Sequence, residues 1–275
     1  MYGHNVTPAT TASAATVPPF LALASDPVRW QLMVALASSD LQVGELTRAT
    51  GQPQNLVSYH LGRLRDGGLV SSHKSSYDGR AAYYRLHLDR CGALLAATGA
   101  ALHPGLPPAV QRPGVATPIT RPTAQGRRRA KVLFVCTGNG TRSQIAEALL
   151  HHSAGDHVDV ASAGSHPKPI HANAVRVLAE LGIDISQARS KPLAQFDGRH
   201  FDYVVTLCDK VREVCPEFPG QRRATHWSIE DPSGLPGSDR ATLPAFRAVA
   251  TDLQSRIGFL IAAIDAEPIT RSNKE

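Results

Sequence analysis

The sequence predicts two domains, a mainly α-helical N-terminal domain with a β-hairpin and a C-terminal α/β domain with a four-stranded parallel sheet. Three observations lead to this prediction. The 275 residues are too many for one average domain and suit two. Residues 102–129 hold six prolines without helical or strand periodicity, which is typical of a linker. After residue 130, strand and helix patterns alternate, as they do in a parallel sheet with helices on both faces.

Composition sets the expected boundaries and the class of protein. Residues 1–17 are rich in Thr, Ala and Ser and lack periodicity, which indicates a disordered tail. We therefore expect a tail at 1–17, a first domain at 18–101, the linker at 102–129, a second domain at 130–267 and a short tail at 268–275. No segment is long and apolar enough to cross a membrane or resembles a secretory signal. Four cysteines do not make a disulfide framework here, and they favour thiol chemistry in a reducing cytoplasm.

The helices of the first domain have clear start and stop signals. Asp26 and Pro27 suit the N-cap and the first position of a helix that runs through Leu36. A short helix is predicted over residues 43–50, where Gly51 ends it. A longer helix is predicted over residues 54–66, with Val57, Leu61 and Leu64 facing inward and two glycines after it.

A β-hairpin follows the helices. Residues 69–74 and 81–88 are predicted strands, and the loop between them contains Asp78-Gly79, a common hairpin turn. Two helices with a glycine-containing turn, followed by a hairpin, make a winged helix-turn-helix. A last helix is predicted over residues 90–101, with Cys91 as a small core residue.

The stretch from Asp26 to Leu86 resembles the ArsR-type bacterial repressor family, most closely in Val57-Ser58-Tyr59-His60-Leu61-Gly62-Arg63-Leu64 and Gly68-Leu69-Val70. The resemblance implies that the helix at 54–66 enters the major groove of operator DNA, and that the last helix forms a homodimer. Residues 41–46 lack the cysteine pair of arsenic-sensing members, so the inducer and its site stay open. The candidate DNA contacts are Gln54, Asn55, Ser58, Tyr59 and Arg63, with Lys74 and Arg80 on the hairpin reaching phosphates.

Charged side chains are distributed unevenly between the two predicted domains and the linker. Residues 1–101 carry 8 basic and 6 acidic side chains, and residues 102–130 carry five arginines and no acid. Residues 131–275 carry 16 basic and 17 acidic side chains. The positive excess therefore lies in the half that would meet nucleic acid and in the segment beside it.

The second domain is expected to form strands at 131–135, 158–162, 203–207 and 224–227, with helices at 144–150, 173–181 and 243–264. Cys136 and Arg142 lie in the loop between the first strand and the first helix, where open α/β sheets bind ligands. Backbone N–H groups of such a loop converge on one point, so they and the helix N-terminus attract an oxyanion. The fork of Arg142 suits two of its oxygens, and the same field favours the thiolate of Cys136. Gly138 and Gly140 are expected to give the backbone freedom that this cradle needs. The remaining candidate ligands of the oxyanion are Thr137, Asn139, Thr141 and Ser143, of which Ser143 can donate to the sulfur.

The pattern Cys136-x₅-Arg142-Ser143 resembles the low-molecular-weight tyrosine phosphatase fold, and residues 132–147 resemble the arsenate reductases built on it. Cys208 and Cys215 have the C-x₆-C spacing of thioredoxin-coupled arsenate reductases. Asp231 matches the general acid of the family. Ser233 and Gly234 follow Asp231 at positions where tyrosine phosphatases of this fold have aromatic residues. This difference argues against phosphotyrosine as the substrate.

These resemblances imply an arsenate reductase fused to an ArsR-like regulator in arsenic resistance, with no bound cofactor or metal. Cys136 would attack arsenate, Cys208 would release arsenite, and Cys215 would take over the disulfide for thioredoxin to reduce. A low-molecular-weight thiol with a glutaredoxin-like protein is the other route. Two alternatives remain open: a tyrosine phosphatase fused to a regulator, and a regulator that senses an oxyanion or redox state without turnover.

Overall fold

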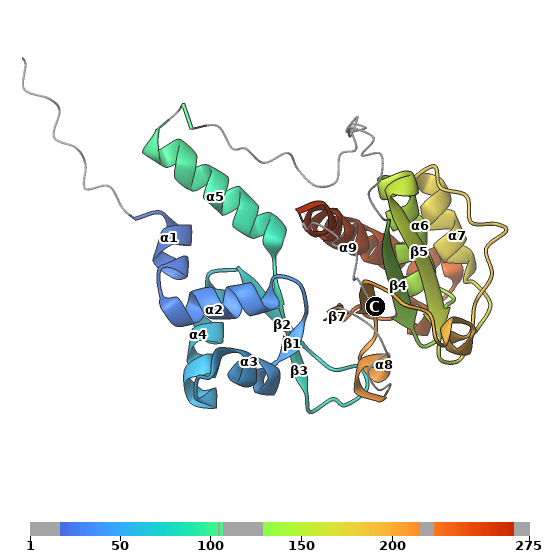
Figure 1. The fold of residues 1–275 in the computed structure, drawn as a ribbon, viewed down its shortest axis with the longest axis horizontal. Helices are drawn as coiled ribbons and strands as arrows, with labels where there is room; N and C mark the ends of the chain where they lie inside the picture. Colours follow the sequence, from blue (N-terminus) through green and yellow to red (C-terminus); the bar gives the residue numbers. More distant parts are fainter. Residues whose placement is uncertain (1–16, 104, 107–128, 215–222, 267–275) are drawn as a thin grey trace, which may run out of the picture.

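The computed structural model describes residues 17–103, 105–106, 129–214 and 223–266. The two predicted tails, most of the predicted linker and Cys215 lie outside the described residues. Two hydrophobic cores occur in the described part, one within residues 20–91 and one within residues 130–264. They correspond to the two lobes seen in Figure 1.

The N-terminal lobe has the predicted winged helix-turn-helix. Asp26 Oδ1 accepts hydrogen bonds from the backbone N of Val28 and Arg29, at 2.9 and 3.0 Å, and so caps the first long helix. Gly51 takes the left-handed conformation (φ 66°) that ends the next helix. The elements are α1 (Pro19–Ala24), α2 (Pro27–Leu36), β1 (Leu41–Gln42), α3 (Val43–Thr50), α4 (Gln54–Asp66), β2 (Val70–Lys74), β3 (Ala82–Leu86) and α5 (Leu88–Leu102).

Two short elements of this lobe were not predicted from the sequence. The helix α1 has six residues and the strand β1 has two, so neither shows a full period of apolar residues. The strand β1 joins the hairpin as a third strand, in the order β1-β3-β2, with Leu41 opposite Tyr84.

The C-terminal lobe has the predicted four-stranded parallel sheet, in the order β5-β4-β6-β7. Cys136 ends the central strand β4, and Cys208 comes two residues after the neighbouring strand β6, so both cysteines lie at the same edge of the sheet. The elements are β4 (Ala130–Cys136), α6 (Arg142–Ala154), β5 (Val158–Gly164), α7 (Ala172–Glu180), β6 (Tyr203–Thr206), α8 (Asp209–Val214), β7 (Arg223–His226) and α9 (Asp239–Ala266). Three short 3₁₀ turns lie at Gly155–His157, Leu193–Phe196 and Pro232–Gly234.

The N-terminal lobe packs against the end of the edge strand β7. The backbone N of Asp40 donates to the carbonyl of His226 at 2.7 Å, and the backbone N of Ser228 donates to Asp40 Oδ2 at 2.8 Å. The indole of Trp227 donates to the carbonyl of Ser38 at 3.3 Å. An exposed sheet edge invites pairing with other chains, so this contact protects a vulnerable part of the sheet.

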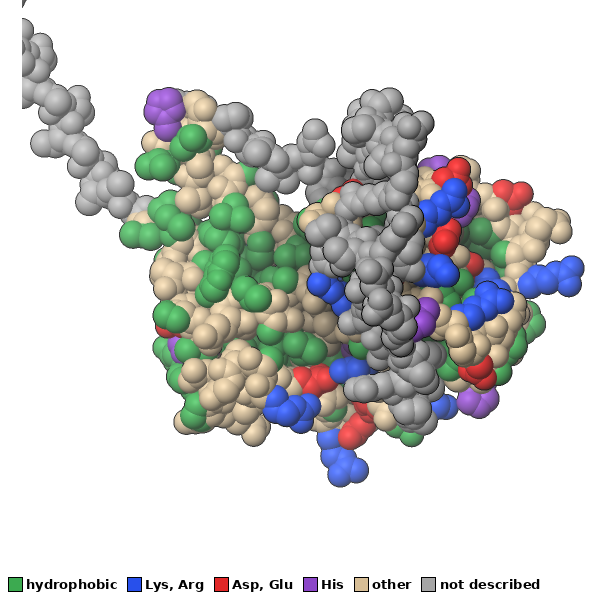
Figure 2. Space-filling model, viewed as in Figure 1, with side chains coloured by type: hydrophobic (Ala, Val, Ile, Leu, Met, Phe, Trp, Pro, Cys, Tyr) green, Lys and Arg blue, Asp and Glu red, His purple; other side chains and the backbone are tan. Residues whose placement is uncertain are grey.

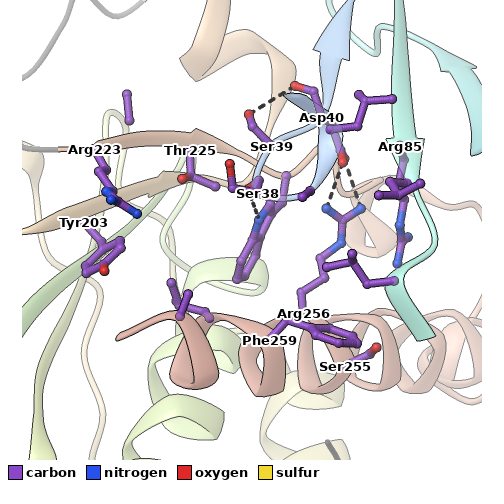
Figure 3. A pocket seen from close by; sticks show the side chains of 18 of the residues that line it. Ser38, Ser39, Asp40, Arg85, Tyr203, Arg223, Thr225, Ser255, Arg256 and Phe259 are labelled. Atoms are coloured by element: carbon purple, nitrogen blue, oxygen red, sulfur yellow. Dashed lines mark hydrogen bonds and ion pairs between the residues drawn. The ribbon is translucent and has the colours of Figure 1, made fainter. Parts of the chain in front are cut away.

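Ion pairs reinforce the contact between the lobes. The guanidinium of Arg256 on α9 donates to both oxygens of Asp40 at 3.0 Å each, and Asp40 is 2% exposed. Arg85 on β3 pairs with Asp252 on α9, and Arg212 on α8 pairs with Glu45 on α3. A cavity of about 500 Å³ lies beside the Asp40–Arg256 pair, between the two lobes (Figure 3).

Candidate active site

The loop after β4 has the shape of an anion cradle. The backbone carbonyls of Thr137, Gly138 and Gly140 accept hydrogen bonds from the amides of residues 166, 168 and 171, at 2.8 to 2.9 Å. Because these carbonyls bind the neighbouring segment, the loop amides are left to face the opposite side. The amide of Asn139 donates to the sulfur of Cys136 at 3.2 Å. This orientation is the one that an oxyanion requires.

The role expected of the two loop glycines needs correction. The left-handed residue of the loop is Asn139 (φ 46°), and neither Gly138 nor Gly140 has a positive φ. Gly140 is instead needed for close approach, because a Cβ there would lie 2.5 Å from the carbonyl oxygen of Pro169. Asparagine tolerates the left-handed region better than most residues, so the loop can place it where we expected glycine.

Buried polar side chains hold Cys136, the candidate nucleophile. The hydroxyl of Ser143 lies 3.0 Å from the Cys136 sulfur, and Asn139 Nδ2 donates to Ser143 at 2.8 Å and to Ser162 at 2.7 Å. Since the Asn139 amide donates to the Ser143 oxygen, the Ser143 hydroxyl hydrogen is free to point at the sulfur. Ser162 in turn donates to Glu147, whose charge is balanced by Lys191 at 2.9 Å.

Arg142 is placed to bind an anion beside Cys136. Its side chain is 5% exposed, and its terminal nitrogens donate to the carbonyl of Ile229 at 3.0 Å and to Asp231 Oδ2 at 2.7 Å. Its buried Nε has no hydrogen-bond partner within the described residues. A buried donor without a partner is unusual, and an oxyanion in the cradle would supply one.

Asp231, the candidate general acid, contacts the cradle through Arg142. Its other oxygen accepts from the backbone N of Ser233 at 3.1 Å, so the same side chain also caps the turn at Pro232–Gly234. Ser233 and Gly234 are exposed beside it and offer no ring on which an aromatic substrate would stack.

Cys208 lies beside the same loop. Its sulfur is 3.3 Å from the hydroxyl of Thr137, the residue that follows Cys136, and the residue is 3% exposed. Burial raises the pKa of the Cys208 thiol, although nearby Arg142 lowers it in part. Cys136, Cys208 and Cys91 are all free thiols, and Cys215 lies outside the described residues.

The raised pKa gives a prediction for the reactivity of Cys208. Below its pKa, the thiolate fraction of a cysteine rises about tenfold for each pH unit. In a Cys136→Ser/Cys215→Ser variant, we expect the rate of Cys208 alkylation by iodoacetamide to rise between pH 7 and pH 9. Peptide mass spectrometry measures the rate, with buried Cys91 as the internal comparison. A rate that is already flat above pH 7 would contradict the raised pKa.

The residue after Cys208 is a hydrogen-bond hub between the lobes. Asp209 is 3% exposed and accepts from His226 Nε2 at 3.1 Å and from the hydroxyl of Ser228. It also accepts from the backbone N and the hydroxyl of Ser76, in the loop of the β2–β3 hairpin, at 2.7 and 2.8 Å. Burial alone would raise the pKa of this carboxyl, but the hydrogen bonds outweigh burial and lower it. No sequence motif had singled out Asp209.

The candidate DNA contacts form an exposed surface. In α4, Val57, Leu61 and Leu64 are buried as predicted, and the other face of the helix is open to solvent. All seven predicted contacts are exposed: Gln54, Asn55, Ser58, Tyr59 and Arg63 on α4, and Lys74 and Arg80 on the hairpin.

The described residues contain no cluster of three or more His, Cys, Asp or Glu side chains that would hold a metal ion. Across the same residues, no helix is both long and apolar enough to pass through a membrane.

Comparison with known proteins gives two family matches. Residues 131–270 match the family described as low molecular weight phosphotyrosine protein phosphatase, and residues 26–72 match the arsR family of bacterial regulatory proteins. An arsenate reductase of Halalkalibacterium halodurans is 39% identical over 126 residues, covering 46% of this chain and 91% of that protein. A glutaredoxin arsenate reductase of Synechocystis sp. is 34% identical over 134 residues, covering 49% of this chain and 98% of that protein. A solved thioredoxin-dependent arsenate reductase of Corynebacterium glutamicum is 35% identical, with a TM-score of 0.41, and the match covers 51% of this chain and 64% of that one.

Proposed function

Because the chain belongs to the low molecular weight phosphotyrosine protein phosphatase family, we propose that its C-terminal lobe uses the Cys136 loop to reduce arsenate to arsenite. The observation that carries this choice is the second buried thiol, Cys208, beside the loop at Thr137. Hydrolysis of a phosphate ester needs one cysteine, whereas reduction needs a second thiol to take over the bond to the first. The curated relatives at 39% and 34% identity are named arsenate reductases.

The reaction runs as a relay of thiols. The Cys136 thiolate attacks arsenic, and a hydroxyl leaves as water with a proton from Asp231. The Cys208 thiolate then attacks the Cys136 sulfur. The S–As bond breaks with its electron pair going to arsenic, so As(V) becomes As(III) and a 136–208 disulfide remains. The Cys215 thiolate attacks Cys208, which moves the disulfide to 208–215 and frees Cys136 for the next substrate.

The geometry of Arg142 and Asp231 supports the first step of this relay. Arg142 now donates to Asp231, so an arriving oxyanion competes for the same guanidinium and also meets the unpartnered Nε. Binding then loosens Asp231 from Arg142, which leaves the carboxyl available to the departing hydroxyl. An external dithiol, such as thioredoxin or a glutaredoxin system, completes the cycle.

The test is sustained arsenite formation by the purified chain with thioredoxin, thioredoxin reductase and NADPH. We expect many turnovers for the wild type and none for Cys208→Ser or Cys215→Ser. Hydrolysis of p-nitrophenyl phosphate without arsenite would make the lobe a phosphatase. Turnover that survives Cys215→Ser would move the reductant to a small thiol. Binding of arsenate without either reaction would leave an oxyanion sensor.

We further propose that the N-terminal lobe binds operator DNA through α4 in the cytoplasm. Its match to the arsR family and the exposed polar face of α4 support this role.

An arginine that contacts a base edge contributes about 1–3 kcal/mol to the free energy of DNA binding. We expect Arg63→Ala to weaken binding roughly 5- to 150-fold, measured by fluorescence anisotropy with the duplex from upstream of the gene. Arg176→Ala, an exposed arginine on α7, is the matched control and should change nothing. Equal loss in both variants would mean that only overall charge matters.

We also propose that two copies pair through the N-terminal lobe. Figure 2 shows hydrophobic side chains gathered on the N-terminal lobe. Trp30 on α2 and Leu95 on α5 are 52% and 50% exposed. A second copy with the same face would bury both, as two-fold dimers do. Sedimentation should give a dimer for the wild type and a monomer for Trp30→Asp/Leu95→Asp. An unchanged mass would place the dimer contact elsewhere.

A further inference from the structure

The hairpin of the N-terminal lobe is docked on the segment that carries the second thiol. We call residues 75–81, the loop between β2 and β3, the wing tip. Ser75 donates to Glu213 at 2.7 Å, and Ser76 donates twice to Asp209. Tyr83 on β3 is 1% exposed and donates to Glu213 at 3.1 Å. Asp209 and Glu213 both belong to α8, so this one short helix holds the wing tip.

The contact occupies groups that would otherwise bind an anion. A backbone N–H and a hydroxyl on the same residue, as Ser76 presents them, suit one phosphate oxygen. Here a carboxylate takes that position, and it is fixed from behind by His226 and Ser228. The Asp209 carboxylate therefore occupies both donors of Ser76, and neither donor is left for a DNA phosphate.

The helix α8 cannot keep its shape when the relay is oxidised. Cys208 precedes it directly, and Cys215 follows it directly in the sequence. A helix of six residues such as α8 is about 9 Å long, and the two cysteines flank it in the sequence. A disulfide requires a Cα separation of about 7 Å or less. A bond between the two cysteines thus requires α8 to unwind, which displaces Asp209 and Glu213 together.

We propose that the wing tip is held on α8 only while Cys208 is a thiol, and that oxidation of the relay releases it. The two functions of the chain are then linked, because each turnover frees the Ser76 donors for a DNA phosphate. The inference rests on the proposed relay between Cys208 and Cys215. It does not require arsenate, because any two-electron oxidant of the two thiols should have the same effect.

The test uses the full chain with Cys136→Ser, so that Cys208 and Cys215 form the only disulfide of the relay. Diamide takes two electrons and two protons from the two thiols and becomes a hydrazine. Hydrogen exchange is followed at the Ser76 amide by mass spectrometry, before and after oxidation. We expect at least tenfold faster exchange after oxidation and no change in Cys136→Ser/Cys215→Ser. In the reduced chain, Asp209→Asn and Ser76→Ala should each loosen the wing tip without oxidant, whereas Ser72→Ala on β2 should not.

Two results would distinguish a failure of the proposed link from a failure of the relay. A proven 208–215 disulfide with unchanged exchange at Ser76 would overturn the link and leave the relay intact. Absence of that disulfide after full oxidation would contradict the relay itself, and the proposed link with it.

Discussion

Replacement of Cys136 by serine is expected to abolish arsenite formation, with a loss of roughly 10⁴-fold or more in turnover. A serine hydroxyl fits the same space but is a far weaker nucleophile at neutral pH, since almost none of it is ionised. The Ser143 hydroxyl and the Asn139 amide are both placed to stabilise a thiolate at this position. Arsenite is measured directly in the coupled thioredoxin assay.

The matched control is Cys91→Ser, in the other lobe. Burial raises the pKa of the Cys91 thiol to about 11, so this cysteine stays protonated and unreactive at neutral pH. We expect turnover close to that of the wild type. Residual arsenite formation above a few per cent in Cys136→Ser, or a comparable loss in Cys91→Ser, would show that the nucleophile had been assigned wrongly.

Replacement of Arg256 by methionine is expected to weaken the contact between the lobes by about 3–5 kcal/mol. The change leaves the Asp40 carboxylate buried with the Ser228 amide but without its bidentate partner. A buried charge without its partner is strongly unfavourable, so the lobes should separate before either unfolds. Urea unfolding followed by fluorescence should change from one transition to two.

Arg247→Met is the control on the same helix. Arg247 also makes a bidentate pair, with Glu180, but its side chain is 51% exposed. Exposed pairs of this kind contribute little to stability, because solvent screens the two charges. We expect a single transition at nearly the wild-type midpoint. Two transitions in both variants would mean that α9 itself, rather than the buried pair, had been disturbed.

The sequence predicted most of what local patterns determine. The Cys136 loop and Arg142 were predicted because a strand, a glycine-containing loop and a helix follow one another within a few residues, whereas Asp231 was predicted only from its resemblance to the general acid of the family. The bounds of α3 and α4 agree with the prediction, since capping residues and glycines mark their ends. The conformational freedom expected of Gly138 and Gly140 is not used for a positive φ, because Asn139 takes the left-handed conformation in this loop.

The contact between the lobes was not predictable in this way. Asp40 and Arg256 are 216 residues apart in the sequence, and Ser76 and Asp209 are 133 apart. Asp40 follows two serines in a short turn and reads as an ordinary solvated residue. Only tertiary structure brings such side chains together, so no spacing rule points to them. The same reason explains why Asp209 went unnoticed beside Cys208.

The position of Arg256 in the last helix has a consequence for how the protein is made. Ribosomes add about 5–20 residues per second, so the roughly 165 residues between Cys91 and Arg256 take about 8–33 seconds to synthesise. The core of the N-terminal lobe is complete at the start of that interval, while the partner of Asp40 has not yet been translated. During synthesis the wing tip and the face of Trp30 are both open, so a nascent chain can find DNA or a second chain first. The C-terminal lobe then closes onto an N-terminal lobe whose core is already complete.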